Sequence, residues 1–219
     1  MRFSEITLEE KQGALQELRQ VKELFAQRGW FPGTSGNLSV RVGEFDREDF
    51  HFAITASGKD KSAHTPEDYL FVDQNGKPAQ ATALKPSAET LIHCEIYRET
   101  GCGAIFHVHT VYNNLISEYY GEEGFVPAQS IELIKAFNIW EEDASIAIPV
   151  LPNYADIPSI AKLVPGVLNQ TIPGIVLRNH GIYAWGKNAF EAKRHLEAFE
   201  FIFEYLYKKL LLDAARPAK

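Results

Sequence analysis

Two histidines placed two residues apart, His107 and His109, are the strongest chemical signal in the sequence. They follow the apolar run Ala104-Ile105-Phe106, which is typical of a buried strand. Alternate residues of a strand point to the same face, so both imidazoles can converge on one metal ion. A bare pair of this kind is more often structural, but an unpaired imidazole is costly to bury at the end of an apolar strand.

A third histidine, His180, lies in Arg178-Asn179-His180-Gly181, at the expected end of another strand. A position before a glycine can present its side chain to a cleft, although such a histidine taken alone is more often structural. Three histidines would leave one coordination position open for a substrate, as catalytic zinc requires. We therefore predict that His107, His109 and His180 bind one Zn²⁺ per subunit. Similar ligands also accept iron, cobalt or nickel.

Two glutamates are candidates for proton transfer. Glu89 ends the stretch Lys85-Pro86-Ser87-Ala88-Glu89 at the expected start of a helix, where a glutamate can simply complement the helix dipole. Glu132 lies in a second predicted helix, where a capping or surface role is the simpler explanation. His93 follows Glu89 by four residues and can pair with it on one helix face. A general acid or base has to lie near the metal-bound substrate, so both glutamates stay candidates.

Three turns rich in small donors occur in the first half of the chain. Thr34-Ser35-Gly36-Asn37 and residues 55–59 (TASGK) combine glycine with hydroxyl groups, and Ser87 lies at a predicted helix start. Glycine lets backbone N–H groups approach an anion closely, and a helix start offers further N–H groups. Each turn alone is also an ordinary loop, but the three together indicate a phosphate site.

The elements that must position these residues alternate between helix and strand. A capping box at Thr7-Leu8-Glu9-Glu10 predicts the start of the first helix, which should end near Gly29. Asn75-Gly76 predicts a tight hairpin turn into a further short strand. Predicted strands span 38–42, 50–55, 69–72, 103–109, 144–150, 174–177 and 182–185, and predicted helices span 87–100, 111–120, 130–137, 157–168 and 189–212. Helices that flank a mixed sheet give an α/β layered domain.

The composition fits one soluble globular domain, with 219 residues, 45% hydrophobic and 23% charged. The net charge of −7 argues against a nucleic-acid or anionic-membrane partner, although a small anionic substrate needs only a local pocket. The first residues contain no apolar export signal, and no stretch approaches the ~20 apolar residues of a membrane span. We expect a cytoplasmic protein in which Cys94 and Cys102 are free thiols.

Five motifs, taken in chain order, resemble the class II aldolase/adducin family. They are Gly-Thr-Ser-Gly-Asn-Leu-Ser (33–39), Thr-Ala-Ser-Gly (55–58), Lys-Pro-Ser-Ala-Glu (85–89), His-Val-His (107–109) and Asn-His-Gly (179–181). The ordered set is specific, although each piece is not, and it covers nearly the whole chain. The resemblance implies a single three-layer α/β/α domain over residues 1–219, with a central mixed, largely antiparallel sheet. It also implies a four-fold homotetramer with sites between subunits.

The resemblance also implies roles for individual residues. The three histidines match the zinc ligands of the family, and Glu89 matches the acid/base of its sugar-phosphate aldolases. The residues that match the substrate-phosphate site are Gly36, Asn37, Ser57, Gly58 and Ser87. Ala88 departs from the pattern, because those aldolases usually have a second serine at this position. The departure weakens one phosphate contact and argues against an aldolase.

Three stretches resemble one branch of the family in particular. They are residues 52–60 (FAITASGKD), 129–136 (QSIELIKA) and 178–186 (RNHGIYAWG). That branch removes water from 5-methylthioribulose 1-phosphate in methionine salvage, and its acid/base glutamate matches Glu132. The resemblance therefore implies a zinc-dependent hydro-lyase whose partner is a small phosphorylated sugar.

Other functions are compatible with the same residues. The metal ligands would equally serve a retro-aldol cleavage or a 4-epimerisation of a sugar phosphate, and product analysis would distinguish them. A non-catalytic, adducin-like interaction domain would have lost the metal ligands, which are all present here. A cupin barrel also uses an HxH pair, but the long helical stretches at 8–28 and 189–212 argue against a mostly β fold.

Overall fold

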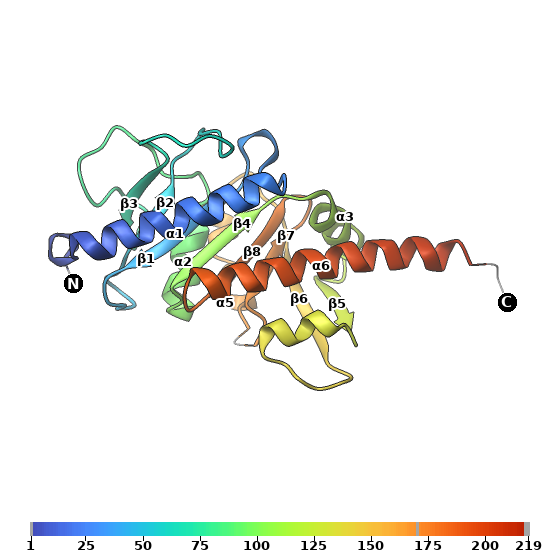
Figure 1. Ribbon diagram of the computed structural model, residues 1–219. Coiled ribbons are helices and arrows are strands. Elements are labelled where there is room, and N and C mark those ends of the chain that lie inside the picture. The colour runs from blue at the N-terminus through green and yellow to red at the C-terminus, as the bar shows by residue number, and fades with distance from the viewer. Residues whose placement is uncertain (1, 170, 217–219) are drawn as a thin grey trace.

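A mixed sheet of eight strands, in the order β3-β2-β1-β4-β8-β7-β6-β5, forms the centre of the chain (Figure 1). The computed structural model describes residues 2–169 and 171–216, so positions 1, 170 and 217–219 of the predicted domain lie outside it. The strands are β1 (Asn37–Val42), β2 (His51–Thr55), β3 (Tyr69–Asp73), β4 (Ala104–Val108), β5 (Phe125–Gln129), β6 (Ser145–Leu151), β7 (Gly174–Leu177) and β8 (Gly181–Gly186). β6 and β7 pair in parallel, and the other neighbours pair antiparallel. This sheet confirms the predicted mixed, largely antiparallel arrangement.

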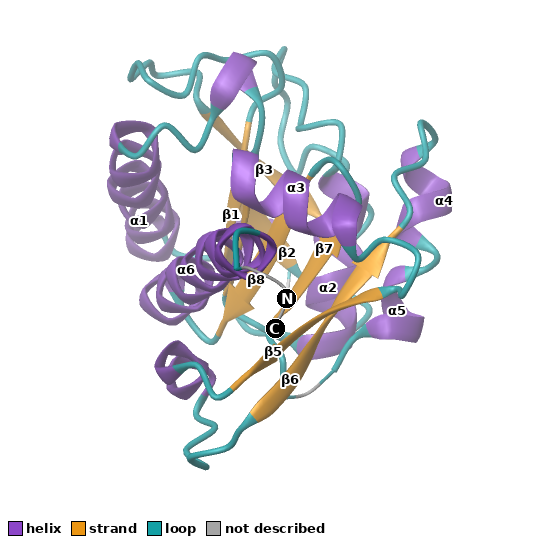
Figure 2. Cartoon of the chain, turned by 90° about the vertical axis from the view of Figure 1, so that its right-hand side faces the viewer, coloured by secondary structure: helices purple, strands orange, loops and turns teal. Residues whose placement is uncertain are grey.

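Helices cover both faces of the sheet, with α1 and α6 on one side and α2, α4 and α5 on the other (Figure 2). The helices are α1 (Leu8–Gln27), α2 (Thr90–Thr100), α3 (Val111–Tyr119), α4 (Ile157–Ala161), α5 (Val164–Val167) and α6 (Ala189–Ala214), with 3₁₀ turns η1 (Phe3–Glu5), η2 (Pro32–Thr34) and η3 (Glu132–Phe137). Two hydrophobic clusters fill the spaces between these layers, one under α1 and α6 and one under α2, α4 and α5. The predicted three-layer α/β/α fold is therefore confirmed.

The alternation of side chains along β4 determines which face of the sheet His107 points to. Ala104, Phe106 and Val108 belong to the cluster under α1 and α6, whereas Ile105 belongs to the cluster under α2. Because successive side chains of a strand point to opposite faces, His107 points toward the α2 side of the sheet.

The starts of α1 and α2 test the helix boundaries that the sequence predicts. Thr7 caps α1 as predicted, because its hydroxyl accepts from the Glu10 N–H while the Glu10 carboxylate accepts from the Thr7 N–H. The predicted start of the second helix at Ser87 is wrong. α2 begins at Thr90, and residues 85–87 are held in an extended connection by the bridge between Pro86 and Ala56. Ser87 therefore lies two residues before the N-cap Glu89, and its carbonyl oxygen accepts from the Thr90 N–H at 3.2 Å.

Three other local predictions differ from the structure, and prolines explain two of them. β5 lies outside the predicted strands because Pro127 interrupts its pattern, which an edge strand tolerates. The predicted helix 157–168 is two short helices, because Pro165 has no N–H to continue a helix from α4. The Asn75-Gly76 turn forms, but an isolated bridge replaces the predicted strand in this part of the described chain.

Both cysteines are free, as predicted. Both are also buried, and burial raises the pKa of each thiol to about 12. Within residues 2–169 and 171–216, every helix is too short or too polar to cross a bilayer.

Candidate active site

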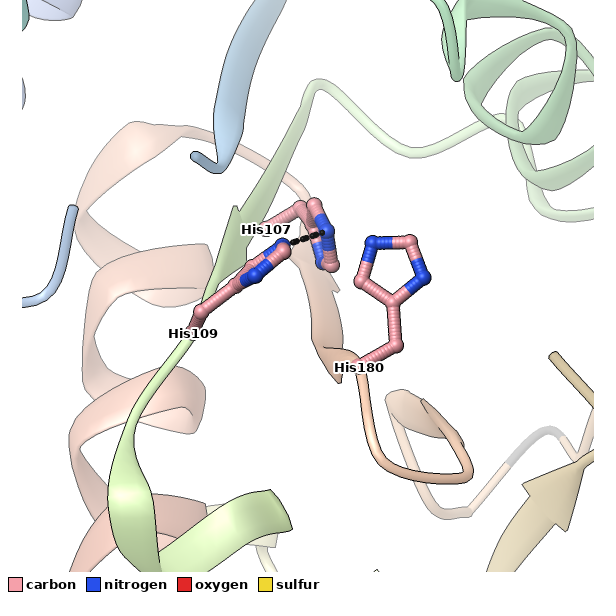
Figure 3. A group of neighbouring side chains, drawn as sticks. All are labelled: His107, His109 and His180. Carbon is pink, nitrogen blue, oxygen red and sulfur yellow. Dashed lines mark hydrogen bonds between the residues drawn. The ribbon is translucent and has the colours of Figure 1, made fainter. Parts of the chain in front are cut away.

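The three predicted histidines meet where the end of β4 lies beside the start of β8 (Figure 3). Their ligand nitrogens all lie within 4.8 Å of one another. The Nε2 atoms of His107 and His109 are 2.8 Å apart, and His180 faces the pair from the turn before β8. Antiparallel pairing explains the meeting, since Val108 lies opposite Ile182. The structure thus brings together residues that are more than seventy positions apart in the sequence.

Hydrogen bonds on the outer side of two rings aim their inner nitrogens at the shared centre. His107 Nδ1 lies 3.0 Å from the Ile182 carbonyl oxygen, and His180 Nδ1 lies 3.0 Å from Asn153 Oδ1. The Ile182 carbonyl oxygen can only accept, so His107 Nδ1 carries the proton and His107 Nε2 keeps its lone pair. Metal-binding histidines are commonly fixed in this way.

The paired imidazoles are held in their neutral form, which is the form that binds a metal ion. Burial lowers the pKa of His107 well below its usual value, and the neighbouring His109 and His180 lower it further. Burial and His180 lower the pKa of His109 to about 4. Three histidine nitrogens close to one another are a donor set that suits zinc.

Ion pairs to α3 fix the turn that carries His180. The Arg178 guanidinium lies 2.8 Å from Glu118 Oε2 and 2.6 Å from Glu122 Oε1. Asn179 has a φ of 52°, a left-handed conformation that asparagine adopts more readily than most residues, and its amide donates to Glu118. The position of His180 therefore depends on this contact between the turn and α3.

Gly181 lets the two histidine-bearing segments approach each other. A Cβ at this position would lie 2.4 Å from the Val108 carbonyl oxygen and 2.8 Å from the His107 ring. It would also lie 2.9 Å from the His109 ring. Any side chain here would push the rings or the strands apart.

Glu89 lies against the histidine cluster from the N-cap position of α2. Its Oε1 is 3.3 Å from His180 Nε2, and its Oε2 is 3.9 Å from His107 Nε2. Burial raises the pKa of Glu89, but the influence of His180, His109 and Asn37 outweighs burial and lowers it overall. The side chain is 18% exposed. Its carboxylate is therefore ionised near neutral pH and accessible to a ligand.

A chain of buried hydrogen bonds holds Glu89 from behind. The Asn37 amide donates to Glu89, so its carbonyl oxygen must accept from His93 Nε2–H. His93 Nδ1 then accepts from Ser39, 2.7 Å away, and Ser39 in turn accepts from the Tyr97 hydroxyl at 2.8 Å. Burial lowers the pKa of His93 to about 3, so this ring is neutral. The predicted direct pairing of His93 with Glu89 is wrong, because Asn37 lies between them.

The predicted phosphate residues divide into accessible and buried positions. The Ala56–Pro86 bridge places the turn of Ser57 and Gly58, which are exposed, beside the half-buried Ser87. Asn37 is fully buried, with the contacts just described. The buried Gly36 has a φ of 73°, and a Cβ there would lie 2.7 Å from the His107 carbonyl oxygen. The phosphate contacts of these five residues stay predictions.

Glu132 lies apart from the cluster of its own chain. It is the first residue of η3, its side chain is 76% exposed, and it lies 2.9 Å from Lys135. Figure 1 shows η3 in yellow, well below the end of β4 and the start of α3. A single chain therefore brings Glu89, and not Glu132, to the histidines.

Two residues near the cluster carried no recognisable motif. Asn153 follows β6 and orients His180. Lys61 follows the turn of Ser57 and Gly58, is 5% exposed, and lies close enough to Glu89 and His109 to influence their charges. Only the pairing of distant loops in the folded chain reveals either residue.

Residues 16–207 match the family described as the class II aldolase and adducin N-terminal domain. The chain belongs to this family. It is 49% identical over 208 residues to a methylthioribulose-1-phosphate dehydratase of Persephonella marina, with 95% of each chain covered. It is 50% identical over 204 residues to the Bacillus subtilis protein of the same name, which covers 93% of this chain and 96% of that protein. These relatives are dehydratases, which belong to the lyases, so this member of the class II aldolase family is an enzyme of the lyase class.

Two solved structures share the fold. L-fuculose-1-phosphate aldolase from Thermus thermophilus superposes with a TM-score of 0.71 at 27% identity, over 93% of this chain and 97% of that chain. YgbL from Escherichia coli, described as a putative aldolase/epimerase/decarboxylase, superposes with a TM-score of 0.73 at 22% identity, over 93% and 91% of the two chains. At these identities the second likeness concerns the fold alone.

Proposed function

We propose that this chain dehydrates 5-methylthioribulose 1-phosphate to 2,3-diketo-5-methylthiopentyl 1-phosphate, a step of methionine salvage, with zinc held by His107, His109 and His180. The observation that carries the proposal is the cluster of three histidine nitrogens beside the ionised Glu89. Relatives at about half identity over nearly their whole length support the choice of substrate.

The donor set supports a metal-assisted reaction. The rings of His107 and His180 point their inner nitrogens toward the centre of the cluster because their outer nitrogens are held by Ile182 and Asn153. Zinc, when bound, would polarise the substrate carbonyl and stabilise the negative charge that develops on its oxygen. The adducin-like alternative without catalysis is disfavoured, because it predicts that these ligands are missing.

The two glutamates divide the proton transfers in this proposal. Glu89, ionised and next to the cluster, takes the proton from C3, the carbon beside the carbonyl. Glu132 gives a proton to the hydroxyl that leaves C4 as water. The resulting enol takes up a proton at C4, releases the proton of its C3 hydroxyl, and becomes the 2,3-diketone. Because Glu132 lies away from the histidines of its own chain, it would serve the site of a neighbouring subunit.

A homotetramer would supply that neighbouring subunit. α6 and α3 expose large apolar side chains, which normally indicates an interaction surface. They are Val111, Leu115, Tyr119, Phe190, Phe201, Tyr205, Leu211 and Leu212. Closed symmetry would let every site receive its Glu132 from the next copy in the same way.

Retro-aldol cleavage between C3 and C4 is the main competing reaction, since some structural relatives are L-fuculose-1-phosphate aldolases. Incubation of the zinc-loaded protein with 5-methylthioribulose 1-phosphate, followed by mass spectrometry, tests the proposal. Dehydration gives one diketone that keeps all the carbons and has lost one water. Two shorter fragments would show an aldolase, and an isomer of unchanged mass would show a 4-epimerase.

A further inference from the structure

Three lysines surround the loop that follows the Ser57-Gly58 turn, and only two of them have a carboxylate partner. Lys22 is buried and lies 2.5 Å from Asp68 Oδ2. Lys59 is partly exposed and lies 2.6 Å from Glu67 Oε2. Lys61 is as buried as Lys22 but forms no ion pair with any carboxylate that the structure describes. Buried charges are normally paired with an opposite charge, so a buried lysine without an ion pair needs an explanation.

The contacts of Lys61 leave most of its hydrogen-bonding capacity unused. An ammonium group has three N–H donors. Nζ donates to the Thr34 carbonyl oxygen at 2.7 Å, which is its one acceptor among residues 2–169 and 171–216. Burial lowers the pKa of Lys61 to about 8, while the nearby Glu89 acts in the opposite direction. The side chain is thus still mainly cationic at neutral pH, with two donors unused.

The position of Lys61 connects the donor-rich turns. It lies three residues after Gly58, and its bond to Thr34 holds the loop that leads to Gly36. Glu89 follows Ser87 by two residues, and its charge influences Lys61. In the held loop, Ser35 Oγ is shielded from solvent and has no hydrogen-bond partner among the described residues. A buried cation that has no ion pair in the described chain and an orphaned hydroxyl in one region suit an anion with several oxygens.

We propose that the Lys61 ammonium group binds the phosphate of the substrate and supplies its counter-charge, in the space between the 33–37 and 55–58 turns. This inference rests on the proposed function for the identity of the substrate, but not for the presence of an anion. A phosphate dianion would give the buried cation the partner that the chain itself does not provide. Lys59 cannot replace it, because its charge is already paired with Glu67.

Titration of the zinc-loaded protein with inorganic phosphate, at constant ionic strength with chloride as the comparison, tests the proposal. Lys61→Gln keeps an amide donor for the Thr34 carbonyl but removes the charge. We expect it to weaken phosphate binding by about 10- to 100-fold, as for a lost charge-assisted hydrogen bond. Lys61→Arg should bind within a few fold of the wild type, and Lys208→Gln, which removes a lysine paired with Glu204 on α6, is the control that should leave binding unchanged.

Kinetics with the sugar phosphate give a second readout. Lys61→Gln should raise KM by a similar factor and change kcat little, whereas a purely structural lysine would lower kcat and the melting temperature together. Equal phosphate affinity in Lys61→Gln and wild type, or no phosphate binding by the wild type, would overturn the proposal. If Lys61→Gln fails to fold, Lys61→Arg becomes the test. Phosphate binding retained by Lys61→Arg supports a role for the charge, and phosphate binding lost in Lys61→Arg contradicts it. Weakened phosphate binding without any dehydration would sink the proposed function and leave this inference standing.

Discussion

Glu89 and Glu132, the two glutamates that we propose for proton transfer, lie in opposite environments. Glu89 is mostly buried, borders two histidines, and accepts a hydrogen bond from Asn37. Glu132 is largely exposed and has Lys135, three residues along the chain, as its one partner in the described structure. The fold of one chain therefore encloses Glu89 with polar partners but leaves Glu132 open to solvent. Assembly of subunits would then supply what the second environment lacks.

The largest effect should come from removing a histidine, which would affect the Glu89 region and spare the Glu132 region. His109→Ala should lose bound zinc and reduce kcat by on the order of 10⁴-fold, because metal stabilisation of charge contributes several kcal/mol. Metal analysis of the purified variant together with turnover checks this. His64→Ala is the control, since His64 lies outside the cluster and should keep its zinc. Full zinc content in His109→Ala would contradict the assigned ligand set.

Replacing either glutamate should give the next largest loss. Glu89→Gln and Glu132→Gln should each lower kcat by about 10²- to 10⁴-fold, which is typical of a lost general acid or base. Zinc content should stay normal in both, because neither change removes a histidine. Unchanged turnover in Glu132→Gln would remove that residue from catalysis.

Mixed oligomers then distinguish one-chain sites from shared sites. If Glu89 and Glu132 of one site come from different subunits, co-expression of the two inactive variants restores some sites with both glutamates intact. Random assembly predicts about a quarter of wild-type activity in a closed symmetric oligomer. Activity no higher than that of the separate variants would place both glutamates on the same chain, or one of them outside the site.

Breaking the support of each glutamate should give a smaller and unequal effect. Asn37→Ala removes the donor to Glu89 and leaves buried His93 without its acceptor, which should cost about 1–3 kcal/mol of unfolding free energy. It should also reduce kcat, because Glu89 loses its orientation. Lys135→Ala breaks only an exposed pair and should cost about 0–1 kcal/mol. Urea unfolding and turnover of both variants compare the two regions, and equal losses would remove the distinction between them.

The same contrast explains how far the sequence alone could predict the site. The HxH spacing on an apolar strand and the glycine after His180 have simple geometric consequences, so the meeting of the three histidines was predictable. The layers followed from periodicity and from capping residues such as Thr7. Ser87 was misplaced because the bridge between Pro86 and Ala56 overrides the local helix signal. A tertiary contact of that kind leaves no trace in nearby residues.

Local sequence patterns could not predict the residues whose role depends on partners far away in the sequence. Asn37 reads as one donor of a glycine-rich turn, and only the folded chain shows it between Glu89 and His93. Lys61 looks like any lysine of a charged loop until its burial and its missing counter-ion are known. Glu132 was selected by resemblance, since its own segment gives no physical reason for catalysis.

A third carboxylate, Glu200, extends the comparison to a fully enclosed group that has no catalytic task. It lies on α6 and accepts hydrogen bonds from Thr110 Oγ1 at 2.6 Å and Asn113 Nδ2 at 2.8 Å, just after His109. Burial raises the pKa of Glu200 to about 7 from an ordinary 4.5, although both hydrogen bonds act against the rise. The folded protein therefore holds this proton more tightly than the unfolded chain does.

The smallest effect on turnover, and a distinct effect on stability, should come from Glu200→Gln. In the wild type, the bound proton of Glu200 contributes to the free energy of unfolding. This contribution is fully present below pH 4.5 and is lost as pH rises toward 7, because the unfolded chain releases the proton first. Between pH 5 and pH 8, the unfolding free energy of the wild type should therefore fall, relative to that of Glu200→Gln, by on the order of 1–3 kcal/mol. Urea titrations of both proteins at the two pH values measure this difference, and kcat should stay near the wild-type value because Glu200 does not touch the histidines. Parallel stability curves would mean that Glu200 is already ionised in the fold, so that its bonds to Thr110 and Asn113 outweigh burial, as the bonds of Glu89 do.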